Sequence, residues 1–304
     1  MKKLLNLRLV SCLVVLLLVS LLIGGCGKTE SVDEVRIGSQ TYSEPIILGE
    51  MVKALIEEGT DLKVTHTPQL SSSLVVQQAM VNKEIDISPR YTGTELTGAL
   101  RVEERMTDPE QVYNLVKDEF AKQFGQTWFK PLGFNNTYAL TVRRDVAEQF
   151  NLKTISDLKS HAKDMIIGTD TSFADRTGDG LEALKEMYGL QFKQVFPMEI
   201  GLVYEAVASK KCDIVVAYST DARIKSFDLV TLEDDLKFFP PYDCALVART
   251  EVLEKHPELK EILAKLEGQI DVETMVGLNY LVDEQNESPE KVARDFLRQK
   301  GLIK

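Results

Sequence analysis

Four of the nine tyrosines in this chain stand where short apolar segments end or where two halves of the chain would join. Tyr91 and Tyr218 follow such segments. Tyr138 follows a polar segment and Tyr242 follows two prolines, at the places where the two halves would join. Aromatic ring faces are electron-rich and apolar, so several together can surround a quaternary ammonium group, which has no N–H to donate. A tyrosine hydroxyl can also fix the orientation of its ring. Taken singly, each tyrosine is more often a core or rim residue, so the pattern by itself only suggests a cation site.

The elements that would position these rings alternate along the chain. Apolar segments at 35–38, 62–66, 85–88, 138–142, 165–168 and 214–217 predict strands. Between and after them, segments with apolar residues at helical spacing predict helices at 43–56, 74–81, 108–120, 181–188, 204–208 and 259–297. Ser43 is expected to cap the first of these helices, and a sequence like a capping box predicts a further helix that begins over 154–159. Repeated β-α-β units are typical of mostly parallel sheets covered by helices, so we expect an α/β fold.

Two lobes fit this order best. Lobe 1 would comprise residues 32–136 and 241–304, and lobe 2 would comprise residues 137–240. The chain would then cross between the lobes twice, near 135–141 and 238–245, and Pro240 with Pro241 stiffens the second crossing. Open α/β sheets bind ligands at the carboxyl ends of their strands. In a two-lobed protein those ends face each other across a cleft that can close.

The N-terminal segment is predicted to be a secretion signal. Lys2, Lys3 and Arg8 precede a nearly unbroken apolar run at 13–23, and small residues lead to Cys26. A cysteine at that place resembles the bacterial lipobox. We therefore expect a signal peptide over 1–25, lipidation of Cys26 and a tether over 26–31, which would make the protein extracytoplasmic and lipid-anchored to the bacterial cell membrane. The alternative is an uncleaved N-terminal anchor, which also places the remaining chain outside the cytoplasmic membrane.

Composition excludes several other classes of function. Without residues 1–25 the chain keeps 33 basic residues against 47 acidic ones. So acidic a chain repels nucleic acid. The remaining cysteines, Cys212 and Cys244, could form a disulfide or be two small buried side chains. No Cys/His cluster has zinc spacing, so no metal and no cofactor are expected.

Two weaker signals are interpreted as structural. The segment 175–186 nearly matches a calcium-binding loop, but Thr177 occupies a position where such a loop has aspartate or asparagine. We interpret it as the start of a helix capped by Asp179. His161 and His256 lie in polar surroundings and are expected to be exposed.

Residues 33–302 resemble the substrate-binding lipoproteins of osmoprotectant ABC transporters, which bind glycine betaine, carnitine and choline. The resemblance rests on the order and spacing of six segments. They are the segments 37–40, 90–94, 136–138, 200–204, 217–221 and 238–243. The resemblance implies a type II periplasmic-binding-protein fold, a ligand in the inter-lobe cleft and no enzymatic activity. It implies a box of Tyr91, Tyr138, Tyr218 and Tyr242 around the ammonium group, with Gln40 and Thr94 at the ligand's polar tail. An ABC permease would be the partner, and the binding protein a monomer.

The chemistry of the tail residues agrees with this resemblance. Gln40 lies just before a predicted helix N-terminus, which favours a carboxylate, and its amide can donate a hydrogen bond. Thr94 donates through a hydroxyl and carries no charge. Some relatives have aspartate there, which would repel a carboxylate and favour choline. Thr94 therefore predicts a site open to betaines and carnitine.

Two alternatives remain open from the sequence. One is an enzyme on the same two-lobed fold, which would need an acid, base or nucleophile in the cleft. The other is an amino-acid binder that uses Arg90 for the carboxylate and Asp221 for the ammonium group, although both are more plausibly structural ion pairs. Tyr204 and Trp128 are interpreted as core residues.

Overall fold

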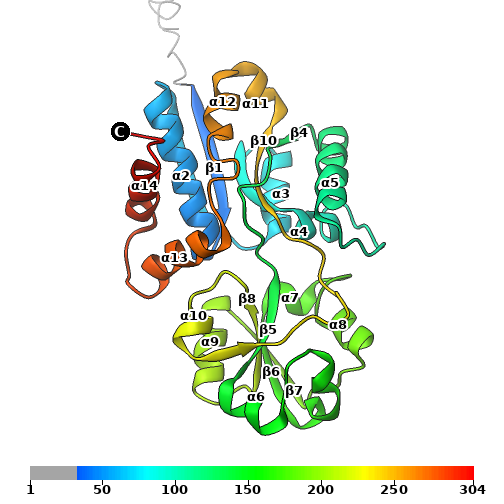
Figure 1. The fold of residues 1–304 in the computed structure, drawn as a ribbon. Coiled ribbons are helices and arrows are strands. Elements are labelled where there is room, and N and C mark those ends of the chain that lie inside the picture. Colours follow the sequence, from blue (N-terminus) through cyan, green and yellow to red (C-terminus); the bar gives the residue numbers. More distant parts are fainter. Residues whose placement is uncertain (1–32) are drawn as a thin grey trace, which may run out of the picture. The chain divides into compact units, whose positions relative to one another are not determined.

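The computed structural model describes residues 33–304 (Figure 1). The predicted signal peptide, Cys26 and the tether lie outside the described residues. Within residues 33–304, no helix is both long and apolar enough to cross a membrane. The described chain folds around two five-stranded sheets, and we call each sheet with its covering helices a lobe.

Lobe 1 contains the sheet with strand order β2-β1-β3-β10-β4. Its strands are β1 (Glu34–Gln40), β2 (Lys63–Leu70), β3 (Ile87–Tyr91), β4 (Gln126–Trp128) and β10 (Cys244–Arg249). Its helices are α2 (Ser43–Gly59), α3 (Ser73–Val81), α4 (Thr92–Thr97), α5 (Pro109–Phe124), α11 (Thr250–Lys255), α12 (Glu258–Ala264), α13 (Val272–Asp283) and α14 (Pro289–Gln299). The last four elements therefore return the C-terminal part of the chain to the lobe in which it began.

Lobe 2 contains the sheet with strand order β7-β6-β8-β5-β9. Its strands are β5 (Tyr138–Arg143), β6 (Ile166–Asp170), β7 (Gln194–Met198), β8 (Ile214–Tyr218) and β9 (Leu229–Thr231). Its α-helices are α6 (Arg144–Phe150), α7 (Thr171–Asp175), α8 (Leu181–Tyr188), α9 (Ile200–Ala208) and α10 (Arg223–Ser226). Two 3₁₀ helices follow α6, at Ser156–Ser160 and Ala162–Asp164. The two-lobed α/β architecture expected from the sequence is confirmed.

The prediction of mostly parallel sheets holds for only part of each sheet. β1 is parallel to β2 and β3, but β10 is antiparallel to β3 and β4. In lobe 2, β6 is parallel to β7 and β8, but β5 is antiparallel to β8 and β9. The reason is connectivity: β5 and β10 are the first strands after the two crossings. Each enters its sheet where the neighbouring strand ends, and so runs in the opposite direction.

The core of lobe 1 forms around α2. Its apolar stripe, which includes Leu48, Met51, Val52 and Leu55, is fully buried. Burying each such side chain stabilises the fold by about 1.5–3 kcal/mol. The expected cap at Ser43 is wrong: Tyr42 is the N-cap residue of α2, and the Ser43 hydroxyl donates to Asp283 instead. The helix start is thus held by a tertiary contact.

Several local expectations need correction. The strand predicted at 85–88 runs over Ile87–Tyr91, because the backbone of the preceding turn bonds to the end of α3. The helix expected from residue 154 is the 3₁₀ helix that begins at Ser156. His256 is buried, not exposed. Cys212 and Cys244 are both free and buried, as small core side chains would be.

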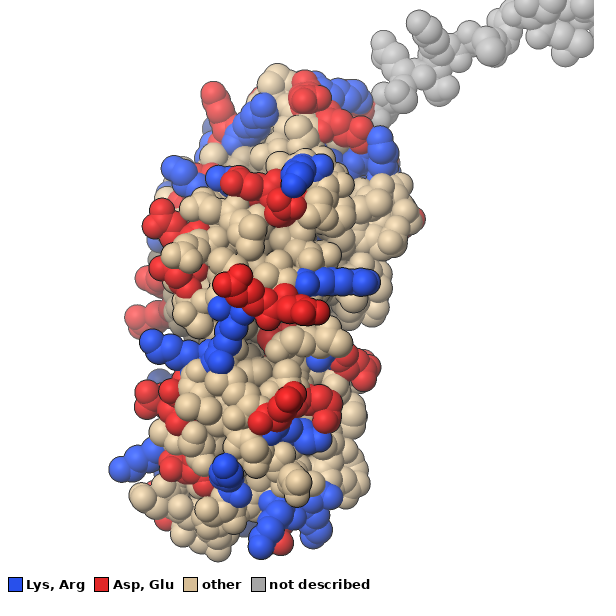
Figure 2. Space-filling model, turned by 90° about the vertical axis from the view of Figure 1, so that its right-hand side faces the viewer, with Lys and Arg blue, Asp and Glu red and all other residues tan. Residues whose placement is uncertain are grey.

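Charge is distributed over the surface without a dominant sign on the face shown in Figure 2. Lys and Arg side chains alternate with Asp and Glu side chains along both lobes in that view. Among the described residues many charged side chains are paired, as in the bidentate contact of Arg144 with Asp228 and the contact of Lys63 with Glu34. This face therefore offers no basic stripe of the kind that nucleic-acid binding requires.

Candidate functional site

Strand pairing brings the predicted tyrosines together at the strand ends. β5 begins with Tyr138, which lies opposite Tyr218, the last residue of β8. In lobe 1, β10 begins with Cys244, which lies opposite Tyr91, the last residue of β3. Tyr242 precedes β10 by two residues and so lies at the same crossing. Because each crossing enters a sheet where a neighbouring strand ends, all four tyrosines lie near the two crossings.

Tyr138 is the centre of the aromatic cluster. Its ring centroid lies 5.5 Å from that of Tyr218 and 5.7 Å from that of Tyr242. Behind it, Phe173 and Phe239 lie at 4.6 and 5.7 Å. These five rings come from β5, β8, α7 and the second crossing. Their faces and edges are in direct contact, which is the geometry of a packed aromatic group.

Tyr42 extends this cluster into lobe 1, and sequence reasoning did not single it out. Its ring centroid lies 5.1 Å from that of Tyr218. It immediately follows the turn after β1, and Gln40 ends that strand. Contact between Tyr42 and Tyr218 therefore joins a ring of lobe 1 to a ring of lobe 2. Its position two residues after the matching segment 37–40 was the only available signal.

Tyr91 joins the site through a buried carboxylate. Its hydroxyl donates to Glu44 Oε1 at 2.7 Å, and the Asn136 amide donates to the same oxygen at 2.7 Å. The Asn279 amide donates to Glu44 Oε2 at 3.3 Å. Glu44 is only 1% exposed. Burial raises the pKa of Glu44, and the hydrogen bonds from Thr220, Tyr91, Asn136 and Asn279 oppose that rise.

A second buried ionic group lies on the other side of Tyr138. The Arg176 guanidinium carbon is 5.6 Å from the Tyr138 ring centroid, and Arg176 Nη1 is 3.2 Å from Asp179 Oδ2. The Tyr242 hydroxyl also donates to Asp179. The expected helix cap is therefore wrong: Gly180 is the N-cap residue of α8, and the Asp179 carboxylate bonds to the site instead.

Asp170 adds a third carboxylate to these surroundings. It ends β6 and is 5% exposed, and its Oδ1 accepts the backbone N–H of Phe173 at 3.0 Å. Burial raises its pKa, while the Phe173 N–H and the nearby Arg176 charge oppose that rise. Oδ2 of Asp170 and Oδ1 of Asp179 are buried without a hydrogen-bond partner among the described residues. Three buried carboxyl groups, those of Glu44, Asp170 and Asp179, therefore lie beside the aromatic cluster, and Arg176 pairs with Asp179.

Gln40 and Thr94 both lie in lobe 1, close in sequence to Tyr42 and Tyr91. Gln40 is the last residue of β1, and Thr94 is in the first turn of α4, three residues after Tyr91. Within residues 33–304, neither side chain is engaged in a hydrogen bond, so both amide and hydroxyl remain free to bind a ligand. The structure thus groups three predicted tyrosines by ring contact and links Tyr91 through Glu44, but shows no bond that ties Gln40 or Thr94 to them.

Gly93 fixes the approach of α4 to the second crossing. A Cβ atom at this position would lie 2.7 Å from the Pro241 carbonyl oxygen and 2.8 Å from Tyr242 Cδ1. The neighbouring Thr92 hydroxyl accepts the Asp243 N–H at 3.0 Å and donates to the Pro241 oxygen at 2.9 Å. Only glycine permits this contact without displacement, so Gly93 sets the position of Tyr242.

The residues interpreted as structural are confirmed in that role. Tyr204 is fully buried, and its hydroxyl accepts the backbone N–H of Tyr218 at 3.2 Å. Trp128 packs edge-on against Phe120 with a centroid distance of 5.4 Å. Arg90 is enclosed by lobe 1 and pairs with Glu95 at 2.6 Å.

Asp221 likewise pairs with Arg223 at 2.6 Å in its own lobe. Arg90 and Asp221 are therefore both engaged in local ion pairs. An amino-acid clamp built from them would have to break both pairs.

A cavity of about 20 Å³ reaches the cluster from the side of α13. Tyr42, Glu44 and Asn279 of lobe 1 and Tyr218 and Arg223 of lobe 2 are among the residues that line it. That volume accommodates about one water molecule. A trimethylammonium group is larger than this cavity.

Comparison with known proteins gives a consistent result. Residues 33–299 match the model of the substrate-binding domain of the ABC-type glycine betaine transport system. The carnitine transport binding protein OpuCC of Listeria monocytogenes is 43% identical over 295 residues, which cover 95% of this chain and 96% of the relative. The glycine-betaine-binding protein of Pseudomonas aeruginosa is 35% identical, and the match covers 89% of each chain.

A solved structure supports the same assignment. The crystal structure of a glycine betaine/carnitine/choline ABC transporter protein superposes with a TM-score of 0.73 at 42% sequence identity. The match covers 89% of this chain and all of the solved chain. Similarity therefore extends over both lobes and is not confined to one of them.

Proposed function

The chain belongs to the family of substrate-binding domains of ABC-type glycine betaine transport systems, and from this premise we propose that it captures small zwitterions with a quaternary ammonium group in a tyrosine cage. Members of this family bind solutes for import and are not enzymes. Glycine betaine and carnitine are the proposed ligands, with choline as a weaker one. The cage consists of Tyr91, Tyr138, Tyr218 and Tyr242.

The observation that carries this proposal is the meeting of phenol rings from both lobes among buried carboxylates. Tyr138 contacts Tyr218 and Tyr242, while Tyr91 donates to Glu44. A quaternary ammonium group gains about 0.5–2 kcal/mol from each desolvated ring face. The carboxylates of Glu44 and Asp179 add charge complementarity, which a purely aromatic pocket would lack.

The tail of the ligand is proposed to bind at Gln40 and Thr94. Both side chains have free donors, and neither carries a negative charge that would repel a carboxylate. Arg176 of lobe 2 is proposed as a further partner for the ligand carboxylate, because its guanidinium lies beside the Tyr138 ring and can pair with a carboxylate. Choline has no carboxylate, so the Arg176 guanidinium would repel its ammonium group with no carboxylate attraction to offset the repulsion.

The lobes are proposed to divide at residues 136/137 and 240/241. Sheet membership supports this division, because β5 to β9 all belong to one sheet and the strands before and after them belong to the other. Rotation about the two crossings would open and close the cleft. We further propose that the protein is lipid-anchored through Cys26, acts as a monomer and delivers its ligand to an ABC permease.

Calorimetry with isosteric ligand pairs tests the proposal. Glycine betaine would be compared with 3,3-dimethylbutanoate, which keeps the shape and the carboxylate but replaces the charged nitrogen with carbon. Choline would be compared with 3,3-dimethyl-1-butanol in the same way. If ring faces and carboxylates bind the cation, the charged member of each pair binds at least about tenfold tighter. Equal affinities within a pair would exclude a cation site.

A further inference from the structure

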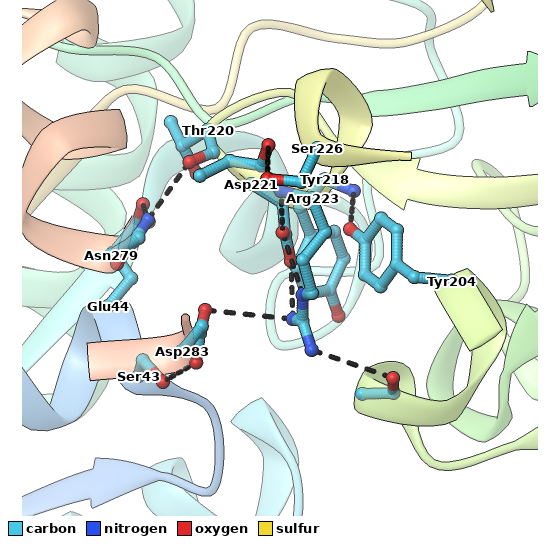
Figure 3. Close-up of polar contacts among 12 residues, drawn as sticks. Ser43, Glu44, Tyr204, Tyr218, Thr220, Asp221, Arg223, Ser226, Asn279 and Asp283 are labelled. Carbon is cyan, nitrogen blue, oxygen red and sulfur yellow. Dashed lines mark hydrogen bonds and ion pairs between the residues drawn. The ribbon is translucent and has the colours of Figure 1, made fainter. Parts of the chain in front are cut away.

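Helix α13 of lobe 1 reaches across to lobe 2 with two polar side chains (Figure 3). The Asn279 amide donates to the Thr220 carbonyl oxygen at 3.1 Å and to Glu44 at 3.3 Å. One helical turn later, Asp283 Oδ2 lies 3.6 Å from Arg223 Nη2. Residues four apart lie on the same face of a helix. One face of α13 therefore makes two separate contacts with lobe 2.

The partners of α13 in lobe 2 are tied to a ring of the cage. Thr220 follows Tyr218 by two residues. The Arg223 guanidinium carbon lies 4.3 Å from the Tyr204 ring centroid, and the Tyr204 hydroxyl accepts the Tyr218 backbone N–H. A shift of Arg223 is therefore transmitted through Tyr204 to the strand end that carries Tyr218.

The partners of α13 in lobe 1 are tied to the opposite side of the same cluster. Glu44, which Asn279 contacts, also accepts the Tyr91 hydroxyl. Ser43 donates to Asp283 and directly follows Tyr42, whose ring contacts Tyr218. Neither Asn279 nor Asp283 is hydrogen-bonded to Tyr138 or Tyr242. Their effect on the cage would thus be indirect.

We infer that Asn279 and Asp283 are positioning residues that latch the two lobes in the closed arrangement and so set ligand affinity without touching the ligand. This inference rests on the proposed function, because it assumes that the ligand is held between the lobes. Both contacts join atoms of different lobes, so they are lost when the lobes rotate apart. A ligand that binds only the closed form then gains affinity in proportion to the closed fraction.

The latch is separable from the folding of each lobe. Arg223 keeps a partner in its own lobe, since Asp221 bonds to its Nε and Nη2 atoms at 2.9 and 2.6 Å. The Asp283 side chain is 16% exposed and retains the Ser43 hydroxyl. Replacing Asp283 with asparagine therefore leaves no buried charge unpaired. The variant should fold normally while it loses the ionic part of the inter-lobe contact.

The test compares Asp283→Asn with the matched control Glu273→Gln, which removes a charge from an exposed position of the same helix. Glycine betaine affinity, its dissociation rate, the thermal midpoint and the radius of gyration from small-angle X-ray scattering without ligand are measured. We expect Asp283→Asn to weaken binding about three- to tenfold, mainly through faster dissociation, and to enlarge the radius of gyration. Glu273→Gln should resemble the unmodified protein in all four measurements.

A double-mutant cycle with Arg223→Gln completes the test. If the two charges act through each other, Asp283→Asn has little further effect in the Arg223→Gln background. Unchanged affinity and scattering for Asp283→Asn, or an effect of equal size in both backgrounds, would overturn the inference. Failure of the proposed function looks different: the unmodified protein would not bind glycine betaine, while the scattering of the Asp283→Asn variant would still report the latch.

Discussion

Replacing Arg176 with methionine is predicted to change which ligands the protein prefers. In the structure the guanidinium lies 5.6 Å from the Tyr138 ring centroid and pairs with Asp179 at 3.2 Å. A quaternary ammonium group against the same ring would have this cation as a close neighbour. A zwitterion brings a carboxylate that can pair with Arg176, whereas choline brings only a hydroxyl. Methionine keeps much of the side-chain volume but removes the charge.

The size of the effect follows from the distance. If the ammonium group lay as far from the guanidinium as the Tyr138 ring centroid does, 5.6 Å, the two charges would repel each other by about 3 kcal/mol at an effective dielectric constant of about 20. That energy corresponds to a factor of roughly one hundred in affinity. Asp179 already offsets part of the guanidinium charge, so the observable change is smaller. We expect the ratio of the choline to the glycine betaine dissociation constant to fall by at least about tenfold.

The assay is calorimetric titration of both ligands into the same variant. Because a ratio is measured on one protein, any loss of stability caused by the unpaired Asp179 affects both ligands and cancels. Arg144→Met is the matched control, since Arg144 forms a surface pair with Asp228 in the same lobe. A ratio that stays within about twofold of the unmodified protein, with binding retained, would refute the role assigned to Arg176.

Four further predictions concern single residues. Thr94→Asp should favour choline over glycine betaine in calorimetry, and an unchanged ratio would contradict the tail site. Tyr218→Leu should weaken glycine betaine binding by about 2- to 30-fold while Tyr218→Phe retains most of it; equal losses would exclude a role for the ring face. Gly93→Ala should lower the free energy of unfolding, measured in urea, by about 1–3 kcal/mol, because the added Cβ would lie 2.7 Å from the Pro241 carbonyl oxygen. An unchanged free energy of unfolding would show that the second crossing can shift to make room for the Cβ. Burial raises the pKa of Glu44, so acidification protonates Glu44 at a higher pH in the folded state than in the unfolded state. The contribution of Glu44 to stability therefore rises as pH falls, while glycine betaine affinity declines. Glu44→Gln should flatten this decline in affinity, and an equally steep decline in the variant would assign the effect to another group.

Much of the fold followed from local pattern alone. The apolar segments that predicted strands correspond to β1, β2, β3, β5, β6 and β8, because buried strands need continuous apolar runs. Strand direction did not follow, because it depends on where the crossings enter the sheets. β4, β7, β9 and β10 were not predicted. β4 and β9 are only three residues long and β7 is mostly exposed, so these three carry no strong apolar signal. β10 (Cys244–Arg249) is a buried strand that was missed, because its first residues were interpreted as part of the second crossing.

The candidate site was predictable to a different degree. Tyr138, Tyr218 and Tyr242 meet as expected, because their places at strand ends and crossings determine where they lie. The part that sequence reasoning missed is ionic. Asp179 precedes a helix, and local rules favour a cap in that position, but a buried tertiary partner, Tyr242, takes its carboxylate instead. Arg176 had no local signal at all, since only the folded chain shows that its side chain reaches Tyr138.

The charges around the cage explain why rings alone would be a poor description of the site. Glu44, Asp170 and Asp179 are all less than 10% exposed, and Arg176 supplies the one positive charge paired within this group. Burial raises the pKa of Glu44 and Asp170, and a cation bound nearby would favour the charged forms of these carboxyl groups. In the proposed site, a quaternary ammonium ligand would supply that charge without needing the hydrogen bonds that a lysine or arginine would require. The tyrosines would then form an apolar wall that brings this cation close to carboxylates without direct contact, which would favour trimethylated heads over ordinary ammonium groups.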